Sequence, residues 1–96
     1  MGQAAPFSTY EITEHFDEVY NSLDLRRQKQ VDKAVYLLFH NSAHPGLNAH
    51  QIKPDKYYWE AYVNRSDRII YIPDGSHLVL VDIVRHDDIW KYGKAP

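Results

Sequence analysis

The segment "RIIYIPDGSHLVLVDIVR" (Arg68–Arg85) contains two apolar runs separated by residues that are typical of a tight turn. The runs are rich in β-branched and aliphatic residues, so the segment predicts a β-hairpin. Successive positions in both runs are apolar, which indicates strands that lie inside a sheet and not at its border. The rest of the chain must therefore supply further strands, and elements that cover the sheet.

The central "IPDGS" sets the expected pairing of the two strands. Pro, Asp and Gly in this order predict a three-residue loop, a type I turn closed by a left-handed glycine. Arg68 would then pair with Leu80, Ile70 with Leu78 and Ile72 with Ser76. A two-residue Asp74-Gly75 loop is the alternative, and it would place Arg68 and His86 on opposite faces of the hairpin.

Side-chain alternation turns this register into two predicted faces. One face would carry Arg68 and His86 at the same end of the hairpin, and it is the more polar one. The opposite face is the better candidate to receive helices. The first face comprises Arg68, Ile70, Ile72, Leu78, Leu80, Asp82, Val84 and His86, and the second Ile69, Tyr71, His77, Val79, Val81, Ile83 and Arg85.

Two helices are expected before the hairpin. Residues 14–23 and 24–40 both carry apolar side chains at helical spacing. Thr13 and Asp24 stand where helix caps are needed, and the very short linker predicts an antiparallel helical hairpin. "NSAHPGLN" then ends the second helix, and residues 49–56 form a polar connection.

Residues 7–13 and 57–64 alternate as strands do, so the element order is β-α-α-β-β-β. We expect an α+β fold with a twisted antiparallel sheet, a helical hairpin on one face and an open concave surface on the other. The length predicts a single domain over residues 1–96, with residues 1–6 as a flexible tail.

Charge and composition limit the possible functions. Eleven Lys and Arg against thirteen Asp and Glu give a net charge of −2, so any nucleic-acid binding must come from local charge. The chain has no cysteine, which excludes disulfides and thiolate metal sites. His40 and His44 have the spacing of a metal pair, but no third ligand completes a site, and no metal or cofactor is expected. With no apolar run of membrane length and no secretory signal, we expect a cytoplasmic protein without membrane contact.

The element order and several short motifs resemble the RelE/ParE superfamily, the toxins of type II toxin–antitoxin modules. The motifs are "HPGLNAHQI", "YYWEAYVN", "DRIIY" and "LVLVDIVRHDDIW", and together they span roughly residues 8–92. The resemblance is strongest to the YafQ-like branch, and it rests on the order and spacing of the motifs.

The resemblance implies a RelE-like fold and a metal-independent endoribonuclease that cleaves messenger RNA, usually on the ribosome. The 2′-hydroxyl attacks the neighbouring phosphate, and the enzyme supplies a base, an acid and a cation. Matched by motif, the catalytic candidates are His86, Arg68, His50 and Asp67. His50 or His86 would be the base, His86 the acid if His50 is the base, and Arg68 would hold the phosphate. Residues expected to contact RNA are Lys53, Arg85, Lys91 and Tyr92.

Two other functions stay open at this point. A ParE-like protein would inhibit DNA gyrase by binding, and such a protein needs no histidine–arginine site. A catalytically silent relative would act as an interaction module, and the acidic charge and the two aspartates after His86 favour it. Both toxin hypotheses imply a cognate antitoxin as partner. The ribonuclease hypothesis adds mRNA and the ribosome to the expected partners.

Overall fold

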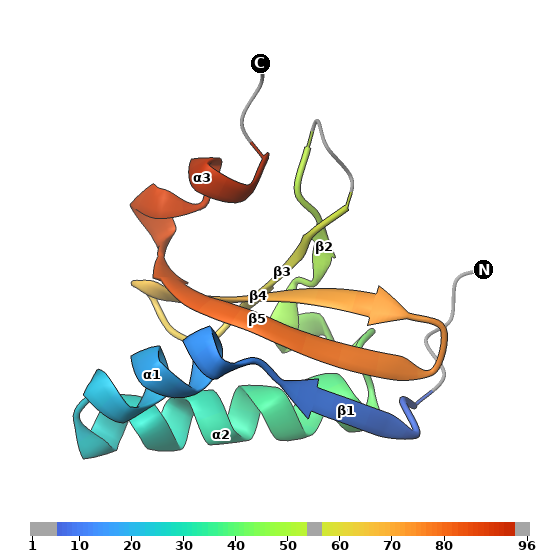
Figure 1. Ribbon diagram of the computed structural model, residues 1–96, viewed down its shortest axis with the longest axis horizontal. Coiled ribbons are helices and arrows are strands. Elements are labelled where there is room, and N and C mark those ends of the chain that lie inside the picture. The colour runs from blue at the N-terminus through green and yellow to red at the C-terminus, as the bar shows by residue number, and fades with distance from the viewer. Residues whose placement is uncertain (1–5, 54–56, 94–96) are drawn as a thin grey trace.

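The computed structural model describes residues 6–53 and 57–93, and they form one five-stranded sheet with helices (Figure 1). The strand order is β1-β5-β4-β3-β2. The α+β class and the predicted order of the main elements are confirmed. The expected flexible tail lies almost entirely outside the described residues. The strands are β1 (Thr9–Ile12), β2 (His50–Gln51), β3 (Trp59–Tyr62), β4 (Asp67–Asp74) and β5 (His77–Arg85).

The sheet is mixed, because β1 runs parallel to β5 while the other neighbouring pairs are antiparallel. The antiparallel pairing predicted for the whole sheet is therefore wrong for β1. A tight turn joins β4 to β5 and so determines their direction. The helical hairpin follows β1, so no turn constrains how that strand meets the edge of β5.

The helices α1 (Glu14–Ser22) and α2 (Leu25–His40) lie on one face of the sheet (Figure 1). Both expected caps are present. The hydroxyl of Thr13 accepts a hydrogen bond from the amide of Phe16 at 3.1 Å, and the carboxylate of Asp24 accepts one from the amide of Arg27 at 2.8 Å. These bonds satisfy amides that have no partner within the helix, so the two helices begin where the sequence predicts. None of the described helices is both long enough and apolar enough to span a membrane.

The main core lies between these helices and the sheet. Side chains from both layers are almost completely buried there, and each of the larger aliphatic and Phe side chains contributes about 1.5–3 kcal/mol by leaving water. The helices supply Phe16, Val31, Ala34 and Leu38, and the strands supply Ala61, Ile69, Tyr71, Leu78, Leu80 and Ile83.

The turn of the central hairpin differs from the expected one. Asp74 pairs with His77, so the loop is Gly75–Ser76 and Pro73 continues the strand instead of opening the turn. Gly75 adopts a φ of 60°, the left-handed conformation that glycine reaches without strain. The predicted three-residue loop is therefore wrong.

A β-bulge also interrupts the hairpin. Ile70 pairs with Asp82 but Tyr71 pairs with Leu80, so Val81 is an extra residue on β5. The bulge reverses the alternation, so Leu80 before it and Ile83 after it both belong to the core. The core residues of β5 are Leu78, Leu80 and Ile83, in place of the expected Val79, Val81 and Ile83.

The other face of the sheet is partly covered as well. The short helix α3 (Trp90–Gly93) follows the 3-10 turn η2 (His86–Asp88) and lies on the side opposite α2 (Figure 1). A second 3-10 turn, η1 (Pro45–Leu47), precedes β2. Ile52 and Ile70 are buried outside the main core, and the rings of Tyr58 and Tyr92 lie 4.9 Å apart. The predicted open surface is therefore only the part of this face that α3 leaves uncovered.

Candidate functional site

The strand register brings three chemically useful residues to the face opposite α1 and α2. His50 pairs with Glu60, and Glu60 pairs with Ile70. Arg68 lies two residues before Ile70 on β4 and pairs with Val84. Their neighbours Ala61 and Ile69 point into the main core. By alternation, His50, Glu60 and Arg68 share the other face.

Glu60 lies between His50 and Arg68. One of its carboxylate oxygens is 3.1 Å from Nε2 of His50, and the other is 3.9 Å from Nε of Arg68. Nδ1 of His50 is 2.7 Å from the carbonyl oxygen of Asn48. Both ring nitrogens thus face acceptors, and a neutral imidazole can donate to only one of them. The two contacts fix the orientation of the His50 ring.

Glu60 is not among the site residues predicted from the sequence. The available signal was a carboxylate in the middle of a strand, on the face shared with Tyr58 and Tyr62 and away from the helices. Its neighbours across the sheet follow only from the register, and β2 was expected to be a polar connection. The pairing that explains Glu60 could not be read from spacing alone.

Arg68 is held in a defined position by its surroundings. Its Nη1 donates to the carbonyl oxygens of Asn64 at 2.7 Å and Asp67 at 3.0 Å. Its guanidinium carbon lies 4.7 Å from the centre of the Tyr62 ring, a cation–π contact. The side chain is 13% exposed. An arginine fixed in this way loses little freedom when it binds an anion.

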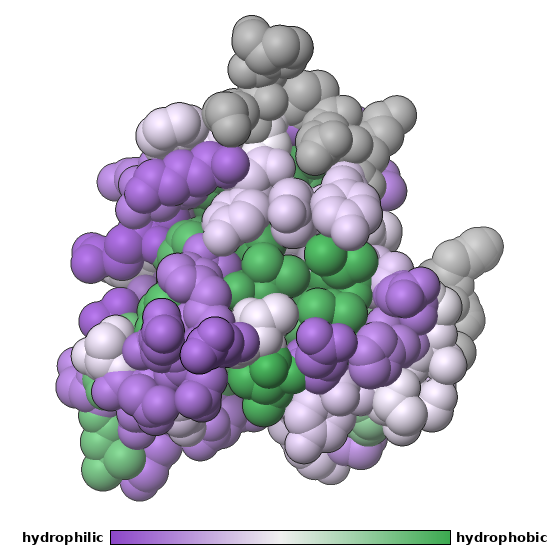
Figure 2. Space-filling view, viewed as in Figure 1, coloured by the Kyte–Doolittle hydropathy of each residue, from purple (hydrophilic) through white to green (hydrophobic). Residues whose placement is uncertain are grey.

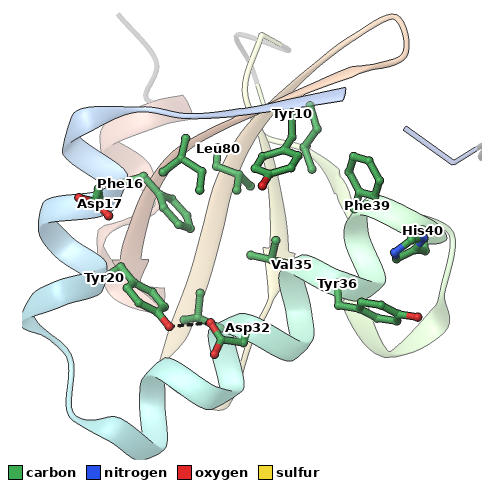
Figure 3. A pocket seen from close by; sticks show the side chains of 13 residues that line it. Tyr10, Phe16, Asp17, Tyr20, Asp32, Val35, Tyr36, Phe39, His40 and Leu80 are labelled. Atoms are coloured by element: carbon green, nitrogen blue, oxygen red, sulfur yellow. Dashed lines mark hydrogen bonds between the residues drawn. The ribbon is translucent and has the colours of Figure 1, made fainter. Parts of the chain in front are cut away.

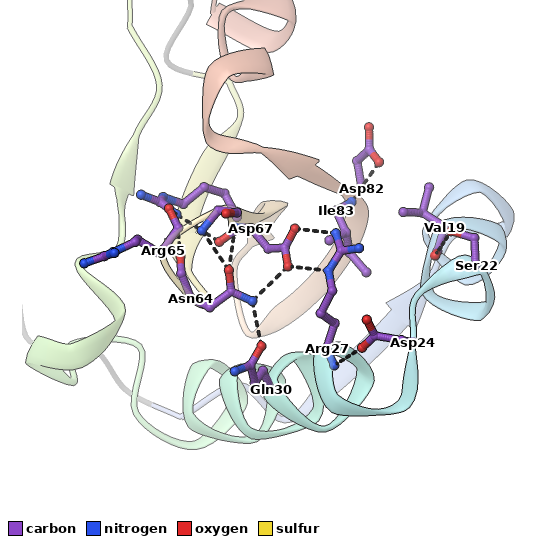
Figure 4. Close-up of polar contacts among 12 residues, drawn as sticks. Val19, Ser22, Asp24, Arg27, Gln30, Asn64, Arg65, Asp67, Asp82 and Ile83 are labelled. Atoms are coloured by element: carbon purple, nitrogen blue, oxygen red, sulfur yellow. Dashed lines mark hydrogen bonds and ion pairs between the residues drawn. The ribbon is translucent and has the colours of Figure 1, made fainter.

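The turn that carries these carbonyls is stabilised by the side chain of Asn64 (Figure 4). Its amide oxygen accepts hydrogen bonds from the amides of Ser66 and Asp67, both at 2.8 Å. Its amide nitrogen donates to Gln30 of α2 at 2.7 Å and to the Asp67 carboxylate at 2.8 Å. The turn is therefore tied to both the helix layer and the start of β4.

Asp67 has a different place from the one expected of a catalytic residue. Its carboxylate is 1% exposed and accepts hydrogen bonds from Nε and Nη2 of Arg27, at 3.0 and 2.8 Å (Figure 4). These bonds, with that from Asn64, hold the pKa of Asp67 below its usual range, despite burial. Asp67 faces α2, on the opposite side of the strand from Arg68, so it has no path to a substrate there. We assign it a structural role.

Arg85 is the last residue of β5, and His86 follows it. Asp67 pairs with Arg85, and the amide of His86 donates to the carbonyl oxygen of Ser66 at 2.7 Å. The backbone of Arg85 is extended, which carries the alternation from Val84 to His86. His86 therefore begins on the face of Arg68 and at the same end of the hairpin, although the register differs from the expected one. Its side chain is exposed and makes no hydrogen bond or ion pair with the other described residues.

The remaining RNA candidates lie around α3. Lys53 and Lys91 are exposed, and the ammonium of Lys91 is 3.8 Å from Asp88. The hydroxyl of Tyr92 donates to the buried carboxylate of Asp82, which His15 of α1 also approaches at 3.0 Å. Burial and this bond raise the pKa of Tyr92. Tyr92 thus anchors α3 to the sheet, whereas the side chains of Lys53 and Lys91 are exposed to solvent.

Among the residues that the structure describes, no three His, Asp or Glu side chains gather in a way that could hold a metal ion. The site consists of a cation, a carboxylate and an imidazole on one face, with a second imidazole at the strand end. These are the groups needed to bind a phosphate and to move protons near neutral pH.

No protein-family model and no curated protein matches this chain. Solved structures do match it. A YoeB/ParE toxin from Agrobacterium tumefaciens has a TM-score of 0.68 at 15% identity, covering 82% of this chain and 99% of that one. A chain of the E. coli DinJ–YafQ toxin–antitoxin complex has a TM-score of 0.68 at 17% identity, covering 81% and 91%. The YoeB dimer from Staphylococcus aureus has a TM-score of 0.67 at 17% identity, covering 81% and 95%. The chain therefore has the fold of the YoeB, ParE and YafQ toxins, as the sequence resemblance predicted.

Proposed function

We propose that this protein is the toxin of a type II toxin–antitoxin pair and an endoribonuclease that cleaves messenger RNA without a metal, in association with the ribosome. The fold supports the toxin role. The observation that carries the ribonuclease proposal is the contact of Glu60 with both His50 and Arg68 on the face opposite the helices. His86 stands at the end of the neighbouring strand.

The groups are suited to an attack of the 2′-hydroxyl on the adjacent phosphate. The O–P bond to the 2′-oxygen forms, the bond to the 5′-oxygen breaks, and a cyclic phosphate and a free 5′-hydroxyl result. Arg68 neutralises the charge on the phosphate oxygens in the transition state. His86, whose ring has no described partner, takes the proton of the 2′-hydroxyl as base.

His50 is the better acid in this scheme. Its two ring nitrogens face the Asn48 carbonyl and the Glu60 carboxylate, so the ring is held in one orientation. Such a ring can give a proton to the leaving 5′-oxygen, and Glu60 keeps it oriented. The proposal assigns Lys53 and Lys91 to the RNA backbone. Arg85 lines the same hollow as Lys91 and is assigned to its border, since its pairing with Asp67 turns it toward the helix side of the sheet.

The partners follow from the same proposal. Solved structures with this fold include YoeB–YefM toxin–antitoxin complexes from Staphylococcus aureus, so we propose a cognate antitoxin for this chain too. The proposed RNA partner is mRNA that is being translated on the ribosome, so the proposed location is the cytoplasm.

A silent interaction module is the second candidate. Arg68 already contacts two main-chain carbonyls and approaches Glu60, and its side chain is only 13% exposed. A phosphate would have to compete with this carboxylate.

Growth arrest with gyrase inhibition and no RNA cleavage would support the ParE-like alternative instead.

The test is cleavage of a defined mRNA by the purified protein, with and without translating ribosomes. Arg68→Ala and His86→Ala should each reduce the rate about a hundredfold or more. Arg26→Ala and His40→Ala are matched controls, because both residues are exposed on α2 and away from the site. Full activity of both site variants would refute the assignment, and an inactive wild-type chain would favour the silent module.

A further inference from the structure

A pocket near the tip of the β4–β5 hairpin continues the proposed site along the sheet. It has a volume of about 700 Å³, and we call it the hairpin pocket. Its lining includes Gln51 of β2, Trp59 of β3, Ile72 and Asp74 of β4, Val79 of β5 and Tyr57. Gln51 directly follows His50 in β2, and Ile72 lies four positions after Arg68 in β4, about 13 Å along an extended strand. A single-stranded RNA with a phosphate at Arg68 can therefore extend into this pocket.

The hairpin pocket offers an apolar surface to a flat ring. Ile72 pairs with Val79, and both are half-buried and lie outside the main core, so alternation places them on the face opposite α1 and α2. Figure 2 shows hydrophobic residues over the middle of the β4–β5 hairpin, bordered by hydrophilic ones. The half-buried Trp59 is held from the core side, where its ring lies 6.1 Å from that of Tyr71. A base that enters the pocket can therefore leave water on its apolar faces.

Tyr57 provides an aromatic surface at the border of the pocket. The residue is 57% exposed, and its ring meets that of Tyr58 edge to face at 4.9 Å. Tyr58 in turn meets Tyr92 of α3 at 4.9 Å, so the row of rings is supported by the anchored helix. Exposed aromatic rings of this kind stack on the bases of single-stranded RNA.

Asp74 provides the charged group of the pocket. It is exposed at the end of β4 and makes no hydrogen bond or ion pair with the other described residues. Its strand partner His77 is engaged elsewhere, with its ring nitrogens 2.7 Å from the hydroxyl of Thr9 and 3.5 Å from the carboxylate of Glu11. The described lining includes no Lys or Arg side chain. Both carboxylate oxygens of Asp74 are therefore available to a ligand.

The acids of the groove on the helix side have other surroundings (Figure 3). This groove lies between α2 on one side and β1 with α1 on the other, and the sheet separates it from the catalytic candidates. There the carboxylate of Asp32 already accepts a hydrogen bond from the hydroxyl of Tyr20 at 2.7 Å. Asp17 is exposed on the first turn of α1. Asp17 therefore serves as a control acid that is remote from the hairpin pocket.

We propose that the hairpin pocket binds a guanine base of the RNA and that Asp74 selects it. An ionised carboxylate only accepts hydrogen bonds, and it can accept two side by side. Guanine presents two adjacent donors, N1–H and N2–H, on its Watson–Crick edge. Adenine and cytosine present a donor beside an acceptor, and uracil a single donor between two acceptors. A paired contact with Asp74 is therefore open to guanine alone, while the ring stacks on Tyr57.

The inference deepens the proposed function and rests on it only for the role of the bound RNA as substrate. The pocket lies beside His50 and on the face of Arg68, so a guanine held there fixes which phosphate of the strand reaches the guanidinium. Asp74 is thus a specificity-determining residue, and it takes no part in moving protons.

Binding is tested with RNA that cannot be cleaved. Four hexanucleotides carry 2′-O-methyl groups in place of the attacking hydroxyls and differ only at the third base, which is guanine, adenine, cytosine or uracil among uracils. Their affinities are measured by fluorescence anisotropy for the wild type, Asp74→Asn and Tyr57→Leu. Asp17→Asn is the matched control, because it removes the same charge from an exposed acid on the other side of the sheet.

Tryptophan fluorescence tests the location. The chain has two tryptophans, so Trp90→Phe leaves Trp59 as the single reporter. A base seated in the hairpin pocket lies against Trp59 and should change its emission, and the change should follow the same binding curve as the anisotropy. Circular dichroism of each variant shows that it is folded.

We expect the guanine hexanucleotide to bind the wild type about tenfold or more tightly than the other three. Asp74→Asn should abolish this preference, because the amide replaces one acceptor by a donor. Tyr57→Leu should weaken all four by about fivefold or more through lost stacking. Asp17→Asn should leave the preference unchanged.

Three results would overturn the proposal. Equal affinities of the wild type for the four hexanucleotides, or no measurable binding of any, contradict the chemistry. A preference that Asp17→Asn changes as much as Asp74→Asn shows a general effect of charge. Emission of Trp59 that stays constant at saturation contradicts the location. Failure here is distinct from failure of the ribonuclease proposal: cleavage without guanine preference refutes only the pocket, and guanine-selective binding by a chain that cleaves no mRNA refutes only the nuclease.

Discussion

Arg27 of α2 forms a paired hydrogen bond with Asp67, the residue that precedes Arg68 on β4. The contact crosses from the helix layer to the sheet and is buried on the Asp67 side. It holds the turn whose carbonyls accept hydrogen bonds from Arg68. Residues on the helix side thereby determine where the guanidinium stands on the opposite face.

Arg27→Met should therefore destabilise the protein strongly. The change leaves the Asp67 carboxylate buried without its cation, and the expected loss is about 3 kcal/mol of unfolding free energy. Denaturant unfolding followed by circular dichroism measures it. Adding Asp67→Asn to the same chain should recover part of the loss, because the unpaired charge is then removed. A double variant no more stable than Arg27→Met alone would contradict this account.

Acid should unfold the protein partly through Asp67. Arg27 lowers the pKa of Asp67 in the folded state below its ordinary value of 3.8. A depressed pKa contributes stability that is present above the unfolded value and is lost as pH falls through the folded one. Unfolding free energies between about pH 5 and 2 should therefore fall more steeply for the wild type than for Asp67→Asn. Equal slopes would show that other carboxylates dominate.

Glu60→Gln should separate binding from chemistry. Removing the carboxylate takes a negative charge from beside Arg68, so RNA should bind more tightly. The same change weakens the contact that orients His50, so the turnover number should fall about tenfold or more. Single-turnover cleavage and filter binding give the two quantities. Weaker binding together with unchanged turnover would exclude this role for Glu60.

Tyr92→Phe should loosen α3 and change the alkaline stability. It removes the hydrogen bond to the buried Asp82 carboxylate, at an expected cost of about 1–3 kcal/mol. Burial and Asp82 raise the pKa of Tyr92 above the ordinary value of 10. A raised pKa contributes stability that is present below the unfolded value and is lost as pH rises through the folded one. Above pH 10 the wild type should therefore lose more stability than the variant, as measured by thermal melting.

Gly93→Ala tests whether α3 must lie close to the sheet. An added Cβ would stand 2.0 Å from Cγ2 of Ile52 and 2.6 Å from the carbonyl oxygen of Lys53, so α3 has to move. Gly75→Ala is the control, since its Cβ meets nothing within 4 Å and its cost, about 1 kcal/mol, comes from the left-handed backbone alone. Gly93→Ala should reduce both stability and RNA affinity, and Gly75→Ala only stability. Similar RNA binding by the two variants would show that the position of α3 is unimportant.

The sequence by itself determined the main elements and the fold class. Helix caps, apolar periodicity and the short linker act over a few residues, so α1 and α2 were predicted nearly to their observed bounds. Element order and motif spacing likewise indicated the resemblance, which the solved structures support at the level of the fold.

Only the tertiary structure decided the register and the partners of each polar side chain. The Gly75–Ser76 turn moves the partner of Ile72 from the expected Ser76 to Val79, and the extra residue Val81 shifts the pairing by one further position. Both shifts are odd, so each reverses the faces, and local sequence does not specify which residue a strand will leave unpaired. The same limit explains why Asp67 was named as a catalytic candidate and Glu60 was not. Their roles depend on Arg27 and His50, which lie far away in the chain and meet them only after the sheet and helices pack, because burial of the apolar core selects the register.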